Sequence, residues 1–274
     1  MRVAFYGTRG SIPVAESDYV RFGGNTSCIL VTLEDGRIAI LDAGTGIRKL
    51  GHDFAARSIQ QGDGIFVGMS HTHWDHIQGF PFFEPAYDPK RHFTISIYRE
   101  GQTTGNLESI FAMQMQREYF PVSLDKMGAS LEFWQTDLSD FTPPSGVMVA
   151  ASKHNHPGGA YGYRITEGKR TLVYCTDVEH SGGIDPKVVA FARNADLLIH
   201  DAQYTPAELR HKRGWGHSSW EQAIEVALEA RVAKVALFHH DPEHNDAFLM
   251  NIERDCQRLF SEAFLAREGL EILV

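Results

Sequence analysis

Residues 70–76 read Ser-His-Thr-His-Trp-Asp-His, and they restrict the chemistry of this chain more than any other segment. A short apolar run precedes them and predicts a buried strand that ends at this polar cluster. Residues two apart in an extended chain point the same way, so His71 and His73 share one side. If a helix begins near Asp75, the side chains of Asp75 and His76 diverge by about 100° and serve different partners.

Three imidazoles and a carboxylate so close together form a donor set for a borderline metal ion such as Zn²⁺, which takes nitrogen and oxygen ligands. Because the four side chains divide into two groups, two ions suit them better than one. The alternative is a polar loop with surplus histidines. Four ligand-capable side chains directly after a strand rarely arise from composition alone, so the segment predicts a metal centre.

Length and composition narrow the class further. A chain of 274 residues forms one large domain or two small ones and can bury a substantial core. Its three cysteines have no C-x-x-C spacing, which argues against a disulfide framework and favours a reducing cytoplasm. No run approaches the ~18 apolar residues of a membrane span, and the apolar stretch at the N-terminus is too short for a signal peptide. We therefore expect a cytoplasmic protein without a membrane partner.

The formal charge of −9, without a dense basic block, disfavours long-range steering of a large polyanion. A local cationic site is still compatible with this charge, because two divalent ions would supply four positive charges.

Strands joined by glycine turns are expected over the first 43 residues, with Asp35-Gly36 as the turn of a hairpin. Further strands are predicted at residues 65–69, 93–98, 131–134, 147–150, 171–177, 195–205 and 232–238. Helices are expected at residues 47–60, 106–119 and 245–267, and residues 216–221 are expected to open another, with Ser218 or Ser219 as its N-cap. The apolar side chains of residues 111–119 fit either the core or a dimer face, so the sequence is compatible with a homodimer.

The pattern His71-x-His73-x-Asp75-His76 resembles the signature of the metallo-β-lactamase superfamily of metal-dependent hydrolases. The resemblance implies a third histidine at a strand end, six residues before a Gly-Tyr pair, and His156 matches it. It also implies a bridging carboxylate and a last histidine, each directly after a strand. The resulting ligand set is His71, His73 and His156 for one ion, Asp75, His76 and His239 for the other, and Asp177 as the bridge.

Several aspartates and histidines near these ligands can be interpreted in more than one way. An isolated aspartate at a strand end, such as Asp177, is usually a turn residue, and here its register with the other ligands favours the metal. Asp42 ends an earlier strand and either orients a ligand histidine or caps a turn. His154 fits the surface or a supporting position, His180 fits a loop, and His240 should point away from His239.

The resemblance implies an α/β fold, a four-layer αββα sandwich of two similar halves with all ligands along one edge where the sheets meet. We see no linker, so residues 1–274 are expected to form a single domain. Two divalent ions would generate a shared hydroxide near neutral pH and neutralise charge on the substrate. The carboxylate of Asp75, which we count as both ligand and catalytic residue, separates this set from branches with a single iron or redox chemistry and favours hydrolysis.

A narrower resemblance concerns residues 200–205 and 216–219, which are similar to paired loops of the phosphodiesterase branch that includes ribonuclease Z. It implies that Asp201 stands in an acidic position, usually Glu, and that His217 helps to protonate the leaving oxygen. A histidine suits that role because its pKa lies near the operating pH. The alternative is a helix-capping loop whose His217 faces solvent.

We therefore expect a binuclear phosphodiesterase acting on small phosphodiesters, such as cyclic nucleotides or cyclic phosphates. The second candidate is the transfer-RNA 3′-processing endonuclease, whose gripping arm is a long insertion between the third histidine and the bridging aspartate. Only residues 157–176 lie there in this chain, so a large structured RNA is a poor partner. A lactonase or thioesterase on the same metals, or a metal sensor, is a different class. Zn²⁺ is the preferred ion, with Mn and Fe as alternatives.

Overall fold

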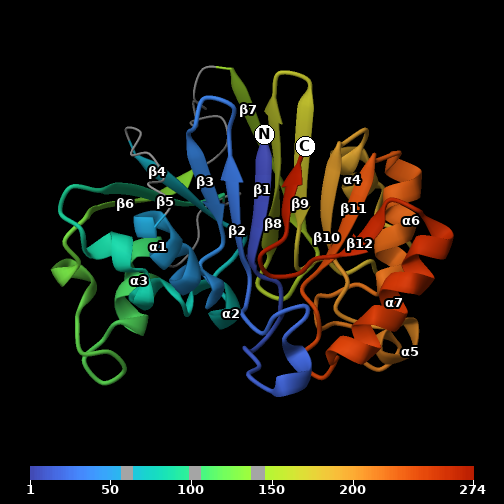
Figure 1. Cartoon of the computed structure of the whole chain (residues 1–274), viewed down its shortest axis with the longest axis horizontal. Coiled ribbons are helices and arrows are strands. Elements are labelled where there is room, and N and C mark those ends of the chain that lie inside the picture. The colour runs from blue at the N-terminus through green and yellow to red at the C-terminus, as the bar shows by residue number, and fades with distance from the viewer. Residues whose placement is uncertain (57–63, 99–105, 137–145) are drawn as a thin grey trace.

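The computed structural model describes residues 1–56, 64–98, 106–136 and 146–274, and Figure 1 shows two sheets side by side with helices on their outer faces. In order across the first sheet, the strands are β13 (Glu271–Leu273), β1 (Arg2–Gly7), β2 (Cys28–Thr32), β3 (Ile38–Leu41), β4 (Ile65–Met69), β5 (His92–Tyr98) and β6 (Ser130–Thr136). The second sheet consists of β12 (Ala263–Leu265), β11 (Lys234–Phe238), β10 (Leu197–Asp201), β9 (Arg170–Cys175), β8 (Ala160–Glu167) and β7 (Val147–His154).

Helices cover the outer face of each sheet (Figure 1). The first sheet carries α1 (Gly46–Ala56), α2 (Trp74–Ile77) and α3 (Leu107–Gln114), and the second carries α4 (Pro186–Ala192), α6 (Trp220–Ala230) and α7 (Asp246–Leu259). Short helical segments are α5 (Pro206–Leu209), η1 (Ser17–Tyr19), η2 (Phe80–Phe82), η3 (Glu84–Tyr87) and η4 (Leu124–Lys126). The expected αββα sandwich is confirmed.

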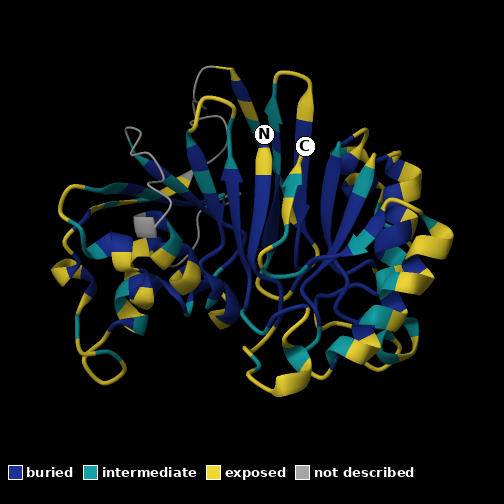
Figure 2. Ribbon diagram, in the orientation of Figure 1, coloured by how far each residue is buried: buried dark blue, intermediate teal, exposed yellow. Residues whose placement is uncertain are grey.

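Alternation along the strands builds the three apolar layers of this sandwich. In β1, Val3 and Phe5 face the second sheet, whereas Ala4 and Tyr6 join the core beneath α1. Side chains alternate across a strand, so one strand supplies both layers. Figure 2 shows the result as a dark blue interior beneath helices whose outer faces are exposed.

Parallel pairing brings the ligand-bearing loops to one edge. β3, β4, β5 and β6 run parallel in the first sheet, and β9, β10, β11 and β12 run parallel in the second. Parallel neighbours end at the same edge of a sheet, so the polar residues that follow β3, β4, β9, β10 and β11 collect there.

Two of the predicted helices end earlier in the structure than expected. The expected helix 106–119 ends at Gln114, because Met115 leaves helical geometry and is buried in the core. The expected helix 245–267 ends at Leu259, because Phe260 is extended, and the chain then adds strand β12 beside β11. The end of the helix expected at 47–60 falls outside the described residues, which end at 56 there. Within the described ranges, the helices are too short or too polar to cross a membrane.

Candidate metal centre

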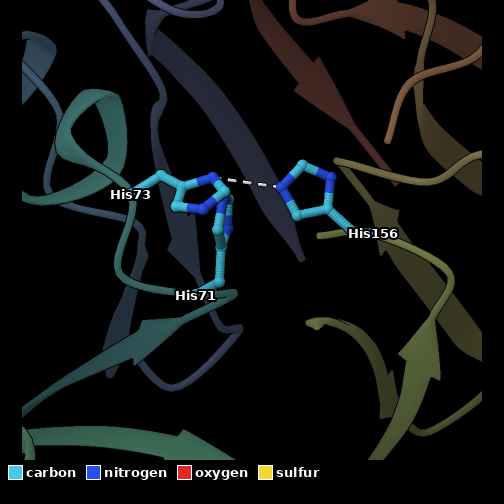
Figure 3. A group of neighbouring side chains, drawn as sticks. All are labelled: His71, His73 and His156. Carbon is cyan, nitrogen blue, oxygen red and sulfur yellow. Dashed lines mark hydrogen bonds between the residues drawn. The ribbon is translucent and has the colours of Figure 1, made fainter. Parts of the chain in front are cut away.

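Two loops bring three histidines together (Figure 3). His71 and His73 follow β4, and His156 follows β7. Nε2 of His156 lies 3.1 Å from Nδ1 of His73, and the ring centroids of His71 and His156 are 4.8 Å apart. Each residue offers one nitrogen to a group in which these atoms all lie within 4.8 Å of one another. The three imidazoles predicted to hold one ion therefore meet in space.

A second group comes from α2 and the end of β11. Oδ2 of Asp75 lies 3.0 Å from Nε2 of His239 and 3.3 Å from Nε2 of His76. The rings of His76 and His239 stack at 5.3 Å with an interplanar angle of 17°. These are the three residues predicted for the other ion.

Asp177, the second residue after β9, lies between the two groups. Its Oδ2 is 3.3 Å from Nε2 of His76 and 3.5 Å from Nε2 of His239. Its Oδ1 is 3.7 Å from Nε2 of His71 and 3.9 Å from Nε2 of His156. Each carboxylate oxygen thus faces one of the two groups.

The donor atoms of this cluster fit divalent cations. Nε2 of His71 and Nε2 of His76 are buried and have no hydrogen-bond partner among the described residues. A buried polar atom without a partner is costly, and an imidazole nitrogen with a free lone pair is a metal ligand. Mixed nitrogen and oxygen donors suit Zn²⁺ and related ions.

The pKa values of the cluster residues also favour the binding of a cation. Burial, together with the neighbouring His76, lowers the pKa of His71 well below its usual value, so His71 is a neutral nitrogen ligand. Burial would raise the pKa of Asp177, but the neighbouring imidazoles, chiefly His239 and His76, hold it well below its usual value. The carboxylate is therefore ionised and requires a cation nearby.

Hydrogen bonds from the protein fix the ligand rings. Nδ1 of His76 donates to Oδ2 of Asp42 at 2.8 Å, and the same oxygen accepts from the hydroxyl of Tyr174 at 2.7 Å. Nδ1 of His239 donates to Oε1 of Gln203 at 3.0 Å. When Nδ1 carries the proton, the lone pair of Nε2 points into the site. The orienting alternative predicted for Asp42 matches this geometry, whereas Tyr174 and Gln203 are absent from the sequence prediction.

Backbone strain gathers at the same place. Asp42, Asp177 and His239 have φ values of 60°, 54° and 63°, in the left-handed region that non-glycine residues rarely adopt. Asp42 and His239 directly follow β3 and β11, and Asp177 is the second residue after β9. Such strain persists only where surrounding contacts hold it, and it is typical of functional sites.

Asp201 and His217 form a pair beside the cluster. Nδ1 of His217 donates to Oδ2 of Asp201 at 2.7 Å and lies 3.8 Å from Oδ1 of Asp177. The His217 ring stacks on that of His239 at 5.0 Å. Burial disfavours the charged ring, but the carboxylates of Asp201 and Asp177 outweigh it and raise the pKa of His217 to about 9. His217 is buried, so the solvent-facing alternative does not describe it.

A buried glutamate holds the loop before His217. The carboxylate of Glu179 accepts from the backbone N–H of Gly214 at 2.8 Å and of Gly216 at 2.8 Å. The carbonyl of Gly216 in turn accepts from Nδ1 of His156 at 2.9 Å. Glu179 therefore supports both a histidine of the cluster and the loop that carries His217, and its role is missing from the sequence prediction.

The remaining histidines lie outside the cluster. His154 is buried and its Nδ1 donates to the carbonyl of Thr176 at 3.2 Å, so it occupies a supporting position rather than the surface. His180 is a buried loop residue with its Nε2 3.4 Å from Nε2 of His200. His240 donates from Nε2 to the carbonyl of Ala266 at 2.8 Å, away from the cluster as expected.

An αββα sandwich with a histidine and aspartate cluster at its strand ends defines a class of metal-dependent hydrolases. Residues 37–240 match the family model described as the beta-lactamase superfamily domain, and the chain belongs to this superfamily. A ribonuclease Z from Picrophilus torridus is 23% identical to this chain over 317 aligned positions, which cover 100% of this chain and 96% of the relative. A ribonuclease Z from Haloarcula marismortui is 24% identical, and the alignment covers 99% of this chain and 96% of the relative.

Solved structures share the fold. The metallo-β-lactamase fold protein YhfI from Bacillus subtilis has a TM-score of 0.71 at 22% identity, over 99% of this chain and 98% of its own. The short form of human tRNase Z has a TM-score of 0.70 at 20% identity, over 100% of this chain and 99% of its own. A diphosphatase of the PhnP family has a TM-score of 0.69 at 19% identity, over 100% of this chain and 97% of its own. The chain is a metal-dependent hydrolase of the metallo-β-lactamase fold, related to ribonuclease Z.

Proposed function

We propose that the protein hydrolyses small phosphodiesters with two divalent ions. The residues that would hold the ions are His71, His73 and His156 on one side, Asp75, His76 and His239 on the other, and Asp177 between them. The ions would supply Lewis-acid activation of water and neutralise charge on a phosphate group. Zn²⁺ is the preferred ion for this donor set, with Mn and Fe as alternatives.

The observation that carries the phosphodiesterase proposal is the Asp201–His217 pair beside the cluster. Asp201 is fully buried and also accepts from the backbone N–H of Ser218 at 2.9 Å, which fixes its orientation. With a pKa of about 9, His217 carries a proton at neutral pH. Nδ1 is bonded to Asp201, so Nε2 is the atom that donates to the leaving oxygen.

A small substrate is favoured over folded RNA. The segment between His156 and Asp177 consists of β8, β9 and a tight turn, without room for a long arm. The ribonuclease Z relative from Picrophilus torridus aligns over 317 positions, more than the 274 residues of this chain, so the alignment contains segments absent here. The net charge of −9 also disfavours a large polyanion.

Transfer-RNA processing is the second candidate. The relatives named ribonuclease Z match nearly the whole chain and nearly their own whole length, and this coverage is the observation that favours it. Cleavage of a precursor transfer RNA at a higher kcat/KM than any small diester would make it the principal function.

The test compares two diesters on zinc-loaded protein. For 2′,3′-cyclic AMP, whose leaving group is an alcohol, His217→Ala should lower kcat about 100-fold or more, because general acid catalysis is lost. For bis(p-nitrophenyl) phosphate the loss should be smaller, because p-nitrophenolate is a weak base and leaves without a proton. Metal content should be retained in the variant.

Two outcomes contradict the proposal. An acyl lactone or thioester turned over far faster than any phosphodiester would assign the site to acyl chemistry. Equal losses on both diesters would show that His217 does not protonate the leaving group.

A further inference from the structure

The loop directly after β1, residues 8–11, approaches one of the two ligand groups. The backbone N–H of Ser11 donates to Oδ2 of Asp75 at 2.8 Å. The hydroxyl of Ser11 accepts from Nε2 of Gln203 at 3.2 Å, and Oε1 of the same amide accepts from Nδ1 of His239 at 3.0 Å. Ser11 therefore contacts one candidate ligand directly and reaches a second through Gln203.

Gly10 lets this loop come close to the imidazole of His239. A Cβ at residue 10 would lie 2.3 Å from Nδ1 and 2.4 Å from Cε1 of His239, closer than Cβ atoms come to other atoms in folded proteins. Gly10 does not have a positive φ, so the glycine is required for space and not for backbone conformation. An added methyl group would have to displace the ring of His239.

The side chain of Arg9 is fully buried and anchors the loop. Its Nε donates to the carbonyl of Gly23 at 2.9 Å, and its Nη1 donates to the carbonyls of Asp241 and His244 at 3.0 and 2.6 Å. Asp241 and His244 belong to the segment that follows His239 along the chain. One side chain therefore ties the loop after β1 to the segment that carries a candidate ligand.

Backbone contacts also fix the loop. The N–H of Gly10 donates to the carbonyl of His240 at 3.0 Å, and the N–H of His240 donates to the carbonyl of Thr8 at 2.9 Å. Ser11 has a φ of 65°, in the left-handed region that non-glycine residues rarely adopt. Such a conformation persists only where surrounding contacts hold it. The direction of the Ser11 N–H is therefore set by the packing of the loop.

The contacts of the loop fall on one side of the cluster. Asp75 and His239, the two ligands that it approaches, are assigned to the same ion. Within the described parts of the chain, no hydrogen bond joins residues 8–11 to the three histidines of the other group. Groups that orient metal ligands contribute about 10- to 100-fold in metal affinity. Damage to the loop should therefore weaken one ion and spare the other.

We propose that the loop after β1 positions Asp75 and His239 for one of the two ions, an inference that rests on the ligands assigned in the proposed function. Arg9 fixes the loop, Gly10 gives room for the imidazole, and Ser11 directs the carboxylate. All three are positioning residues, since they act through the ligands and do not bind the ion.

The test measures the affinity of each bound zinc ion by stepwise competition with a chromogenic chelator. Gly10→Ala places one methyl group against the ring of His239. It should weaken one of the two ions by about 10- to 100-fold and leave the other near its wild-type affinity. Arg9→Lys keeps the charge but loses the planar fork of donors, so it should weaken the same ion.

A ligand variant identifies the ion that is weakened. His239→Ala removes the imidazole itself, so it should lose the ion that Gly10→Ala weakens. The double variant should bind zinc no more weakly than His239→Ala alone, because the added methyl group acts only through the missing ring. A change that merely loosens the fold would not show this dependence.

Gly36→Ala is the matched control. Gly36 lies in the turn between β2 and β3 with a φ of 87°, and a Cβ there would meet no atom within 4 Å. The substitution strains the backbone, so it should lower the melting temperature while both ions keep their wild-type affinity. Thermal denaturation reports whether each variant folds, and Arg9→Lys keeps the question answerable if Gly10→Ala does not fold.

Wild-type affinity for both ions in Gly10→Ala and Arg9→Lys would overturn the inference and leave the proposed function standing. Equal weakening of both ions would also overturn it, because the loop would then support the whole site. Fewer than two ions in folded wild-type protein would instead remove the binuclear site of the proposed function, and the inference with it.

Discussion

The contact with Asp201 raises the pKa of His217, so under the proposed general-acid role the pH profile of activity should depend on this one buried carboxylate. The negative charge of Asp201 raises the pKa of His217, against the opposing effect of burial. A general acid acts in its protonated form, so activity should fall as pH rises through that pKa.

Asp201→Asn should therefore move the alkaline limb of kcat to lower pH. Without the carboxylate, the raised pKa of His217 falls, and the ring loses its proton sooner as pH increases. We also expect kcat on 2′,3′-cyclic AMP to fall by about 100-fold. The pH dependence of kcat measures both effects.

Asp196→Asn is the control, since Asp196 accepts from the N–H of Thr171 at 2.8 Å, away from the cluster. An unchanged alkaline limb in Asp201→Asn would show that the limb reports another group.

Asp42 should control metal affinity without being a ligand itself. Its carboxylate accepts from Nδ1 of His76, from the hydroxyl of Tyr174 and from the backbone and side chain of Ser70. Partners of this kind contribute about 10- to 100-fold in metal affinity.

We predict that Asp42→Asn weakens zinc binding by about that factor, measured by competition with a chromogenic chelator. Tyr174→Phe removes one of the hydrogen bonds and should have a smaller effect in the same direction. Wild-type affinity in Asp42→Asn would contradict the orienting role.

The candidate ligands could be predicted from the sequence because their signal is local. His71, His73, Asp75 and His76 form one short pattern directly after an apolar run. Gln203 and Glu179 carry no such signal. Gln203 meets His239 across 36 residues and Glu179 meets Gly214 across 35, contacts created by neighbouring strands and not by sequence proximity. A family pattern names ligands, but not the chain-specific groups that hold them.

At the scale of elements, the loop between α5 and α6 depends on Glu179. Its carboxylate is buried and accepts from the N–H groups of Gly214 and Gly216. Without it, both donors lose their acceptor, at a cost of about 1–3 kcal/mol for the buried N–H of Gly216. The carbonyl of Gly216 would then no longer fix the ring of His156.

Glu179→Ala should therefore lower both the melting temperature and zinc affinity, whereas Glu221→Ala, on the exposed first turn of α6, should change neither. Calorimetric unfolding and chelator competition provide the two readouts. A variant with lower stability and wild-type zinc affinity would show that the loop does not position His156.

Elements buried on both faces were the ones that periodicity predicted well. β4 is a continuous apolar run, and β10 begins as one at Leu197–Ile199, as expected for parallel strands covered on both sides, although the strand expected at 195–205 is limited to Leu197–Asp201. Residues after Leu259 were predicted as helix, yet Ala263–Leu265 pairs with Val235–Leu237 in the structure. This pairing depends on the edge of an existing sheet, which local propensity does not encode.

At the scale of the whole molecule, the cluster joins the two halves of the sandwich. The first sheet contributes the loop after β4, and the second contributes the residues after β7, β9 and β11. The arrangement places buried carboxylates and unpaired imidazole nitrogens between the sheets. Removing a bound cation would therefore destabilise the fold as well as stop catalysis.

We predict that zinc raises the melting temperature of chelator-treated protein. At a free ion concentration about 1,000 times Kd, binding stabilises the folded state by about 4 kcal/mol. For a chain of this size, that corresponds to about 10 °C. Asp177→Asn should show a smaller shift, and a zinc-independent melting temperature in wild-type protein would contradict the prediction.

That residues 1–274 act as a single domain stays a prediction, which a single coincident unfolding transition would support.

The central claim is that seven side chains from both sheets form one binuclear site. The most direct measurement is metal content by inductively coupled plasma mass spectrometry on zinc-saturated protein after dialysis. The account predicts two ions per chain in the wild type, and fewer when Asp177 is replaced by Ala. One ion or none in the folded wild-type protein would contradict it.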